Sequence, residues 1–495
     1  MNSIARIVNA FPERIIFACA GFISLALYLL TTGQTVNFHD EAEFALRAYQ
    51  LGATHSPGAP LFVLIGHMLG FLVPNPVLAS SLVSVISAAI TAGLVGVISY
   101  RLTEKLTVSV SGAMAFASIF TIWGNAIISE AYALSLLFVV WSTAVVFTNQ
   151  KDRQIGSTYF RWKISLLYGF ALAAHFANIL LFPAYLLIFF MGKNHSKSDA
   201  AKFILVISLF VFLIAISNVL LAMNRVPFGE VSPDSLATVF LYMLGSQHDP
   251  LMIRGVDFYW GRISEHFLIF TRHYWFVLIP FGLIGAVQVC IKEQAGGLFL
   301  VMVYLIYMGY FTLFGSGDYF LMVGPAYFIF SVWVIVGLTN LNKLIPGRWM
   351  EGAITLVLLS VTTLNLYVQL KGRYIDAQSS SAEQYALEAF EIIPANSIVI
   401  ARWSEFTALN YMQEVEGMRS DLRIMVPARE KRLYEYGEVM DYMAYVKAEI
   451  CISPVVTNKV TEDIEEQYYL NSLGDIGDEP EWFQLGPKSP CDASK

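Results

Sequence analysis

Long apolar runs recur along most of this chain, and they restrict its fold more than any other feature. Stretches long enough to cross a bilayer begin near residue 14 and continue to residue 370. Only 14% of the 495 residues are charged, whereas a soluble domain carries about 25%. We therefore expect a polytopic α-helical membrane protein, with no large soluble domain before residue 371.

The apolar runs predict eleven transmembrane helices. They cover residues 15–30, 77–100, 106–123, 127–148, 164–174, 177–191, 203–223, 274–291, 297–314, 319–340 and 351–370. The run at 61–73 is short for a span, so we interpret it as an interfacial helix in the first outer loop. With a cytoplasmic N-terminus, 14 Lys and Arg residues fall in predicted inner segments and 5 in predicted outer loops before the tail.

Residues 371–495 have a different pattern and predict a small α/β domain. The segment has 12 Lys and Arg against 22 Asp and Glu, which argues against nucleic-acid binding. Helices at 379–393, 406–415 and 430–448 and strands at 397–400 and 422–426 predict a parallel sheet, followed by a loosely ordered acidic end at 461–495. We therefore expect two domains, 1–370 in the membrane and 371–495 outside the cytoplasm, where Cys451 and Cys491 could form a disulfide.

Three acidic residues stand just after the first predicted helix. Asp40, Glu41 and Glu43 lie within four residues, and the i, i+3 spacing places Asp40 and Glu43 on one face if a helix begins here. The helix dipole favours acids in a first turn, so an ordinary interfacial helix is one interpretation. Ionisable residues at a membrane boundary more often mark a reaction or transport site. We expect Asp40 to act as a general base, and the acids could also hold a divalent cation, although carboxylates alone are a weak metal signal.

Other polar residues at predicted helix ends are candidates for binding a substrate. Glu130 stands near the outer end of one predicted helix, and a structural ion pair is the alternative to a role in binding. His175 separates two short apolar runs, and the alternative is a histidine that only packs in the interior. A phosphorylated lipid at the outer face would need one or two arginines, because a guanidinium binds phosphate oxygens in pairs. The sequence does not decide among the outer-loop residues Arg225, Arg254, Arg262 and Arg272. We take Arg254 and Arg262 as candidates, and the alternative is ordinary salt bridges with Asp249, Asp257 or Glu265.

The tail adds one weaker candidate site. Trp403 and Glu405 follow its first predicted strand, where ligands approach an open α/β sheet. The sequence contains no Gly-rich phosphate loop, Ser/His/Asp pattern or zinc-ligand spacing.

These motifs together resemble a known family. Residues 40–43 fit Asp-x-x-Glu, residues 55–60 fit His-x-Pro-Gly-x-Pro, and Glu130 with Tyr132 fits a Glu-x-Tyr between two helices. The pattern resembles the protein O-mannosyltransferase-like transmembrane family of the GT-C membrane glycosyltransferases, and the segment 410–421 is similar to its tail. Ser56 and Ala59 depart from the family, which usually has Pro and an aromatic residue there. Residues 402–405 replace an expected acidic, Asn-containing turn.

The resemblance implies an inverting GT-C glycosyltransferase. It would move a sugar from a polyprenyl-phosphate donor to a protein hydroxyl or a glycan at the outer face of the bilayer. Asp40 and Glu43 would be catalytic, and no metal ligand is assigned. The residues expected to bind the substrate are Glu41, His55, Glu130, Tyr132, His175, Arg254 and Arg262.

Two other functions fit parts of the sequence. Carboxylates, His175 and broken helices also suit a proton-coupled transporter or a flippase of lipid-linked saccharide, but the acids stand at helix ends and no repeated halves are visible. A non-catalytic scaffold for polymer assembly would tolerate replacement of Asp40. Short loops and the lack of a retention signal favour the plasma membrane of a bacterium.

Overall fold

The computed structural model describes most of the chain. The described residues are 11–151, 157–190, 197–228, 232–245, 254–315, 317, 319–341, 347, 349–428, 432–435, 438–476 and 481–488. They form two compact units. Unit 1 comprises residues 1–32, 81–214 and 248–376, and unit 2 comprises residues 33–80, 215–247 and 377–495.

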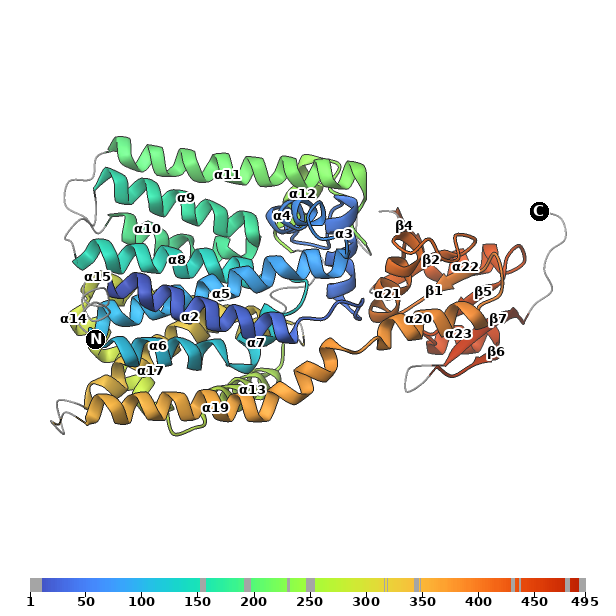
Figure 1. Cartoon of the computed structure of the whole chain (residues 1–495). Helices are drawn as coiled ribbons and strands as arrows, with labels where there is room; N and C mark the ends of the chain where they lie inside the picture. The colour runs from blue at the N-terminus through green and yellow to red at the C-terminus, as the bar shows by residue number, and fades with distance from the viewer. Residues whose placement is uncertain are drawn as a thin grey trace. The chain divides into compact units, whose positions relative to one another are not determined.

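Apolar helices make up unit 1 (Figure 1). They are α2 (Pro12–Thr31), α5 (Pro76–Thr103), α6 (Leu106–Ala117), α7 (Phe120–Ala126), α8 (Tyr132–Lys151), α9 (Thr158–Ala174), η1 (Phe176–Leu181), α10 (Phe182–Phe190), α11 (Lys197–Asn224), α13 (Val256–Tyr274), α14 (Ile279–Lys292), α15 (Gln294–Leu313), α16 (Tyr319–Met322), α17 (Gly324–Thr339) and α19 (Met350–Ala377). The division between the units falls within α5, α11 and α19. The predicted domain boundary at 370/371 also lies within α19.

The helices confirm a multi-pass membrane protein without fixing the predicted number of eleven spans. Among the described residues, six helices are long and apolar enough to cross a membrane, or up to eight if two bent pairs are each one span. The bent pairs are α6 with α7, at 72°, and α13 with α14, at 93°. Several predicted spans, including α17, are shorter apolar helices. Most of α13 was predicted as loop, because its charged residues interrupt the apolar run.

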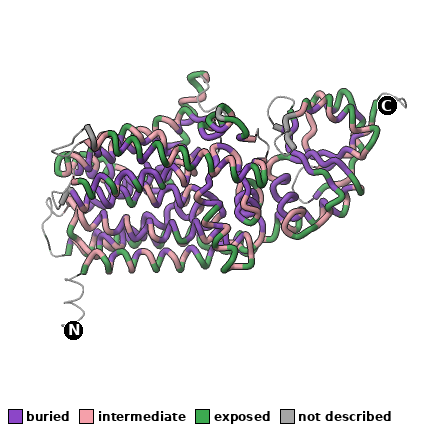
Figure 2. Tube along the Cα trace, turned by 90° about the horizontal axis from the view of Figure 1, so that it is seen from above, coloured by how far each residue is buried: buried purple, intermediate pink, exposed green. Residues whose placement is uncertain are grey.

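Lipid-facing and protein-facing helices differ in burial (Figure 2). In α2 and α11 only 28% of the most apolar window is buried, and Phe22 and Leu205 are exposed. By contrast, α17 is buried over almost its whole length. It packs closely on α14, where a Cβ at Gly285 would lie 1.8 Å from the Trp333 carbonyl oxygen. Small residues therefore allow these two backbones to touch, as in other membrane helix pairs.

Unit 2 combines two short helices from the first loop with an α/β fold. Its further elements are α3 (Asp40–Gln50), α4 (Pro60–Gly70), α12 (Leu236–Met243), α20 (Ser381–Ile392), β1 (Ile398–Ile400), α21 (Trp403–Glu414), β2 (Arg423–Ala428), β3 (Arg432–Glu435), β4 (Glu438–Asp441), α22 (Tyr442–Glu449), β5 (Val455–Thr457), α23 (Glu462–Gln467), β6 (Tyr468–Gly474) and β7 (Trp482–Pro487). The strand order is β4-β3-β2-β1-β5-β7-β6. The β1–β2 pair is parallel, as predicted. The β1–β5 pair is also parallel, although no strand was predicted at β5, and the outer pairs are antiparallel.

Two expectations for the tail differ from the structure. Residues 432–435 and 438–441 form strands β3 and β4 rather than the first half of a helix. Leu433 is buried while its neighbour Arg432 is exposed, which is the alternation of a strand. The acidic end contains α23, β6 and β7, and Trp482 is fully buried. Of the two tail cysteines, Cys451 is disulfide-bonded, whereas Cys491 lies outside the described residues.

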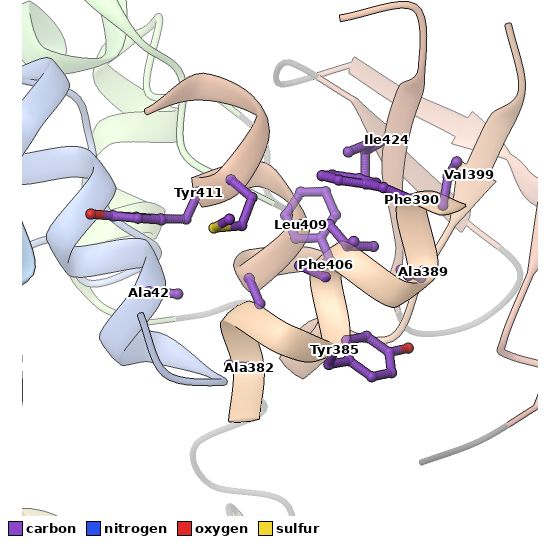
Figure 3. Packing of buried hydrophobic residues seen from close by; sticks show 14 of the residues in the cluster. Ala42, Ala382, Tyr385, Ala389, Phe390, Val399, Phe406, Leu409, Tyr411 and Ile424 are labelled. Carbon is purple, nitrogen blue, oxygen red and sulfur yellow. The ribbon is translucent and has the colours of Figure 1, made fainter. Parts of the chain in front are cut away.

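One apolar core joins the first loop to the tail within unit 2 (Figure 3). Ala42 of α3 belongs to the same buried cluster as Tyr385 of α20 and Phe406, Leu409 and Tyr411 of α21. Burial of such aromatic and aliphatic side chains contributes roughly 1.5–3 kcal/mol each. The acidic helix α3 is therefore held by residues more than 340 positions away in the sequence.

Candidate functional site

The acidic motif forms the first turn of α3, which begins at Asp40. Asp40, Glu41 and Glu43 all lie in this turn, and the preceding residue, His39, has φ of 64°. The i, i+3 spacing brings Asp40 and Glu43 together: one ligand atom from each, and one from His55, all lie within 4.8 Å of one another. Glu41 accepts a hydrogen bond from Asn37 Nδ2 at 3.1 Å. The first loop therefore gathers two carboxylates and one imidazole at one place.

Glu43 and His55 form a buried carboxylate–imidazole pair. Glu43 is fully buried; its Oε1 accepts from the backbone N–H of His55 at 2.7 Å, and its Oε2 lies 2.5 Å from His55 Nδ1. Burial raises the pKa of the Glu43 carboxyl above its ordinary value, and the neighbouring imidazole opposes that shift. The pair fixes the orientation of the His55 ring.

A tryptophan from the tail completes this cluster. Trp403 is the first residue of α21, and its Nε1 donates a hydrogen bond to Asp40 Oδ1 at 2.6 Å. The indole also lies edge-on to the His55 ring, with centroids 6.0 Å apart, and stacks on Phe406. Trp403 was only a weak candidate from its position after β1. The other candidate there, Glu405, is 2% exposed and belongs to the interior of unit 2.

The His-x-Pro-Gly-x-Pro motif is a turn that α11 and α12 hold in place. Ser56 Oγ donates to the carbonyl of Tyr242, and the Tyr242 hydroxyl donates to the carbonyl of Thr54. Gly58 has φ of +77°, and a Cβ there would lie 2.6 Å from Asn218 Oδ1 and 2.9 Å from Tyr242 Cε1. Only glycine fits this turn without strain. The turn therefore presents His55 to Glu43.

A buried arginine anchors the other end of α3. Arg47 is 3% exposed; its guanidinium lies 3.7 Å from the centroid of the Phe228 ring and donates to the carbonyl of Val226 at 2.5 Å. Burial lowers the pKa of Arg47 to about 10. Gln50 in turn donates to Glu414 of α21 at 3.0 Å. These contacts fix α3 against both the 224–228 segment and the tail.

The predicted residues Tyr132, His175 and Glu130 lie in unit 1. Tyr132 and His175 are neighbours, with ring centroids 5.6 Å apart, and both line a pocket together with Asn125 and Tyr307. His175 also accepts a hydrogen bond from the backbone N–H of Ala177 and so caps η1. Most of the residues that line this pocket are apolar, and Asn125, Ser135 and His175 add polar groups to it.

Glu130 stands beside this pocket in the chain and is 4% exposed. Its Oε1 accepts from the backbone N–H of Ala131 at 2.8 Å, and its carbonyl accepts from Ser84 Oγ at 2.8 Å. Glu130 therefore stabilises the start of α8.

The two predicted arginines differ in their surroundings. Arg262 is 7% exposed, forms a salt bridge of 3.0 Å with Glu265, and stacks 3.7 Å from the Tyr319 ring centroid. Arg254 lies 4.6 Å from the centroid of the Phe258 ring. Arg262 thus has the ordinary salt bridge that the sequence left as the alternative.

The family-like tail segment at 410–421 has a structural role. Arg419 donates to the carbonyls of Phe390 and Ile393 at the end of α20, and its guanidinium pairs with both oxygens of Asp421, at 2.9 and 3.0 Å. The carboxyl of Asp421 is also bonded to the backbone N–H of Asn396. The Arg419 bond chiefly lowers the pKa of Asp421 to about 2. This pair closes the C-terminal end of α20.

Comparisons with known proteins agree with the motifs. Residues 40–198 match the family model of the protein O-mannosyl-transferase TMEM260 N-terminal domain, which starts at Asp40 and includes the His55 turn, Tyr132 and His175. No curated protein matches this sequence.

Two solved structures have the same fold. ArnT from Cupriavidus metallidurans bound to undecaprenyl phosphate is 9% identical, with a TM-score of 0.58, and the match covers 96% of this chain and 98% of that one. The structure of the same ArnT in the apo state has a TM-score of 0.53 at 9% identity, and the match again covers 96% of this chain and 98% of that one. Residues 40–198 are therefore similar to the N-terminal domain of protein O-mannosyl-transferase TMEM260, and the chain shares its fold with ArnT.

Proposed function

We propose that this protein is an inverting glycosyltransferase that moves a sugar from a polyprenyl-phosphate carrier to a protein hydroxyl or a glycan. The observation that carries the proposal is the cluster of Asp40, Glu43, His55 and Trp403 within unit 2. The family name and the undecaprenyl phosphate bound by ArnT support the reaction class and the type of donor.

Asp40 is the general base in this proposal. The acceptor hydroxyl oxygen attacks the anomeric carbon of the sugar, and its proton passes to the Asp40 carboxylate. The bond between the anomeric carbon and the carrier phosphate breaks from the opposite side, and the phosphate leaves with the electron pair. Attack from one side and departure from the other inverts the anomeric configuration.

Glu43 and Trp403 position this chemistry. Trp403 holds one oxygen of Asp40 at 2.6 Å, which leaves the other carboxylate oxygen for the acceptor. Glu43 fixes His55, whose imidazole can hydrogen-bond to the substrate beside Asp40. The sequence predicted a catalytic role for Glu43, and we assign that role to the positioning of His55, because the Glu43 side chain is fully buried.

The same groups suit a divalent cation. Two carboxylates and one imidazole with donor atoms within 4.8 Å of one another form a plausible ligand set. Asp40, Glu43 and His55 would hold such an ion, which would supply positive charge next to the leaving phosphate.

The reaction is proposed to take place on the outer side of a bacterial plasma membrane, with a cytoplasmic N-terminus. The bias of basic residues supports this orientation. The disulfide at Cys451 supports an extracytoplasmic tail, because disulfides persist in oxidising compartments.

The test is a transfer assay with purified full-length protein in liposomes. Polyprenyl-phosphate mannose with a radiolabelled sugar serves as the donor, and a Ser/Thr-rich peptide or a glycan serves as the acceptor. We expect labelled acceptor with an anomeric configuration opposite to that of the donor, determined by NMR. Movement of the labelled lipid across the bilayer without any transfer would instead establish a flippase.

A further inference from the structure

Two arginines of unit 1 share one aromatic ring. The guanidinium carbon of Arg272, in the last turn of α13, lies 3.7 Å from the centroid of the Phe120 ring. The guanidinium carbon of Arg373, in α19, lies 5.0 Å from the same centroid. The two positive charges are therefore separated by no more than the sum of these distances.

Neither arginine has a salt-bridge partner among the described residues. Arg373 is fixed by a hydrogen bond from Nη2 to the Phe120 carbonyl at 2.7 Å and by contacts of 3.4 Å with Gln369. Gln369 is itself bonded to the Ser118 carbonyl. Arg272 is exposed and stacks on Phe120. Exposed Asp376 is the acid whose charge acts on Arg373.

Like charges held together without an acid in salt-bridge contact, among the described residues, favour an anion between them. Two guanidiniums present several N–H donors, and phosphate oxygens accept such donors in pairs. Arg262 is different, because Glu265 already neutralises it. The pair at Phe120 is therefore a better phosphate site than Arg262.

The surface beside Arg272 is apolar. Leu268 is 64% exposed, Phe276 63% and Val277 68%, all within five residues of Arg272 in the chain. Exposed apolar side chains on a membrane protein face lipid. If the bound anion is the headgroup of a lipid, the hydrocarbon chain of that lipid would cover these side chains. The ligand chemistry is thus a phosphate headgroup attached to a hydrocarbon chain.

We propose that Arg272 and Arg373 bind the phosphate of a lipid at Phe120. If that lipid is the polyprenyl-phosphate carrier, the assignment of its ligand rests on the proposed function. A bilayer phospholipid headgroup offers the same chemistry, and the experiment below distinguishes it from the carrier.

The test measures lipid binding by full-length protein in a neutral detergent, without any transfer reaction. The probes are undecaprenyl phosphate, undecaprenol, which lacks the phosphate, and dioleoylphosphatidylglycerol. Arg272→Gln removes one charge where no hydrogen bond is lost, and Arg272→Lys keeps the charge. Lys371→Gln, on an exposed residue of α19, is the control for a charge change of the same size.

We expect Arg272→Gln to weaken undecaprenyl phosphate binding about 10-fold or more, which corresponds to the loss of a charge-assisted hydrogen bond. Arg272→Lys should have a smaller effect, undecaprenol binding should not change, and Lys371→Gln should match the wild type. If Arg272→Gln weakens the binding of undecaprenyl phosphate alone, the ligand of this site is the carrier. If it weakens the binding of phosphatidylglycerol equally, the ligand is a bilayer headgroup.

Two results would overturn the proposal. One is that Arg272→Gln and Arg373→Gln both bind the anionic lipids within 2-fold of the wild type. The other is that undecaprenol binding falls as much as undecaprenyl phosphate binding, which would show that the arginines act only on structure. A wild type that binds undecaprenyl phosphate through this pair but transfers no sugar rejects the proposed function and leaves this site standing.

Discussion

Replacing Trp403 with Phe tests whether the tail acts on Asp40. The substitution removes Nε1 and its 2.6 Å hydrogen bond to Asp40, while a phenyl ring still packs against Phe406 and His55. We therefore expect the fold to survive and the acceptor-activating carboxylate to lose its fixed orientation.

The size of the effect follows from the bond that is lost. A hydrogen bond to a charged group contributes about 1.5–3 kcal/mol, and 1.36 kcal/mol corresponds to a tenfold change in rate. If the bond acts by orienting Asp40 in the transition state, kcat should fall about 10- to 100-fold, with little change in the KM for the donor. The transfer assay in liposomes measures both quantities.

The control is a second tryptophan of the same unit. Trp482 Nε1 donates to the Tyr385 hydroxyl at 2.9 Å in the buried core, so Trp482→Phe removes a comparable bond that is not made to Asp40. It should lower thermal stability and leave the kcat of the folded protein unchanged. The Asp40→Asn/Trp403→Phe double variant should be no slower than Asp40→Asn alone, because both changes act on one group. Additive losses would refute the role of Trp403 in positioning Asp40.

Three further predictions concern the residues around the cluster. Gly58→Ala should destabilise the protein by about 1–3 kcal/mol and reduce transfer, because its Cβ would overlap Asn218 Oδ1, whereas Gly70→Ala, with nothing within 4 Å, should be neutral; thermal unfolding and the transfer assay test both. Glu43→Gln should lower stability by about 1–3 kcal/mol and lower kcat, since the His55 ring loses its charged partner; equal activity and melting temperature would contradict the pairing. The folded-state pKa of Asp421 is depressed to about 2, so its stabilising effect is present above its ordinary pKa of 3.8 and is lost as the pH falls towards 2; melting temperatures from pH 5 to 2.5 should fall more steeply for the wild type than for Asp421→Asn.

Local patterns in the sequence predicted the parts of the site that depend on neighbouring residues. The spacing of Asp40 and Glu43 predicted that both lie on one face of a helix, and the Pro and Gly residues after His55 predicted a turn. The spacing of apolar residues in the tail predicted α20, β1 and α21 close to their positions in the structure. In these cases a few adjacent side chains decide the backbone conformation.

Contacts between distant residues could not be predicted in the same way. Trp403 and Asp40 are 363 positions apart, and Ala42 shares a core with residues of the tail. Nothing in the local sequence marks Tyr242 as the residue that holds the Ser56 turn. Arg373 was likewise missed, because a single arginine near the end of an apolar run reads as an ordinary interfacial charge.

The most direct measurement is the transfer rate of Asp40→Asn in liposomes. The asparagine Oδ1 can still accept from Trp403 Nε1, so the structure should be unchanged and only the proton acceptor is lost. The account predicts a fall in kcat of about 10²–10⁴-fold at an unaltered melting temperature. A rate within a few-fold of the wild type would show that Asp40 is not the base.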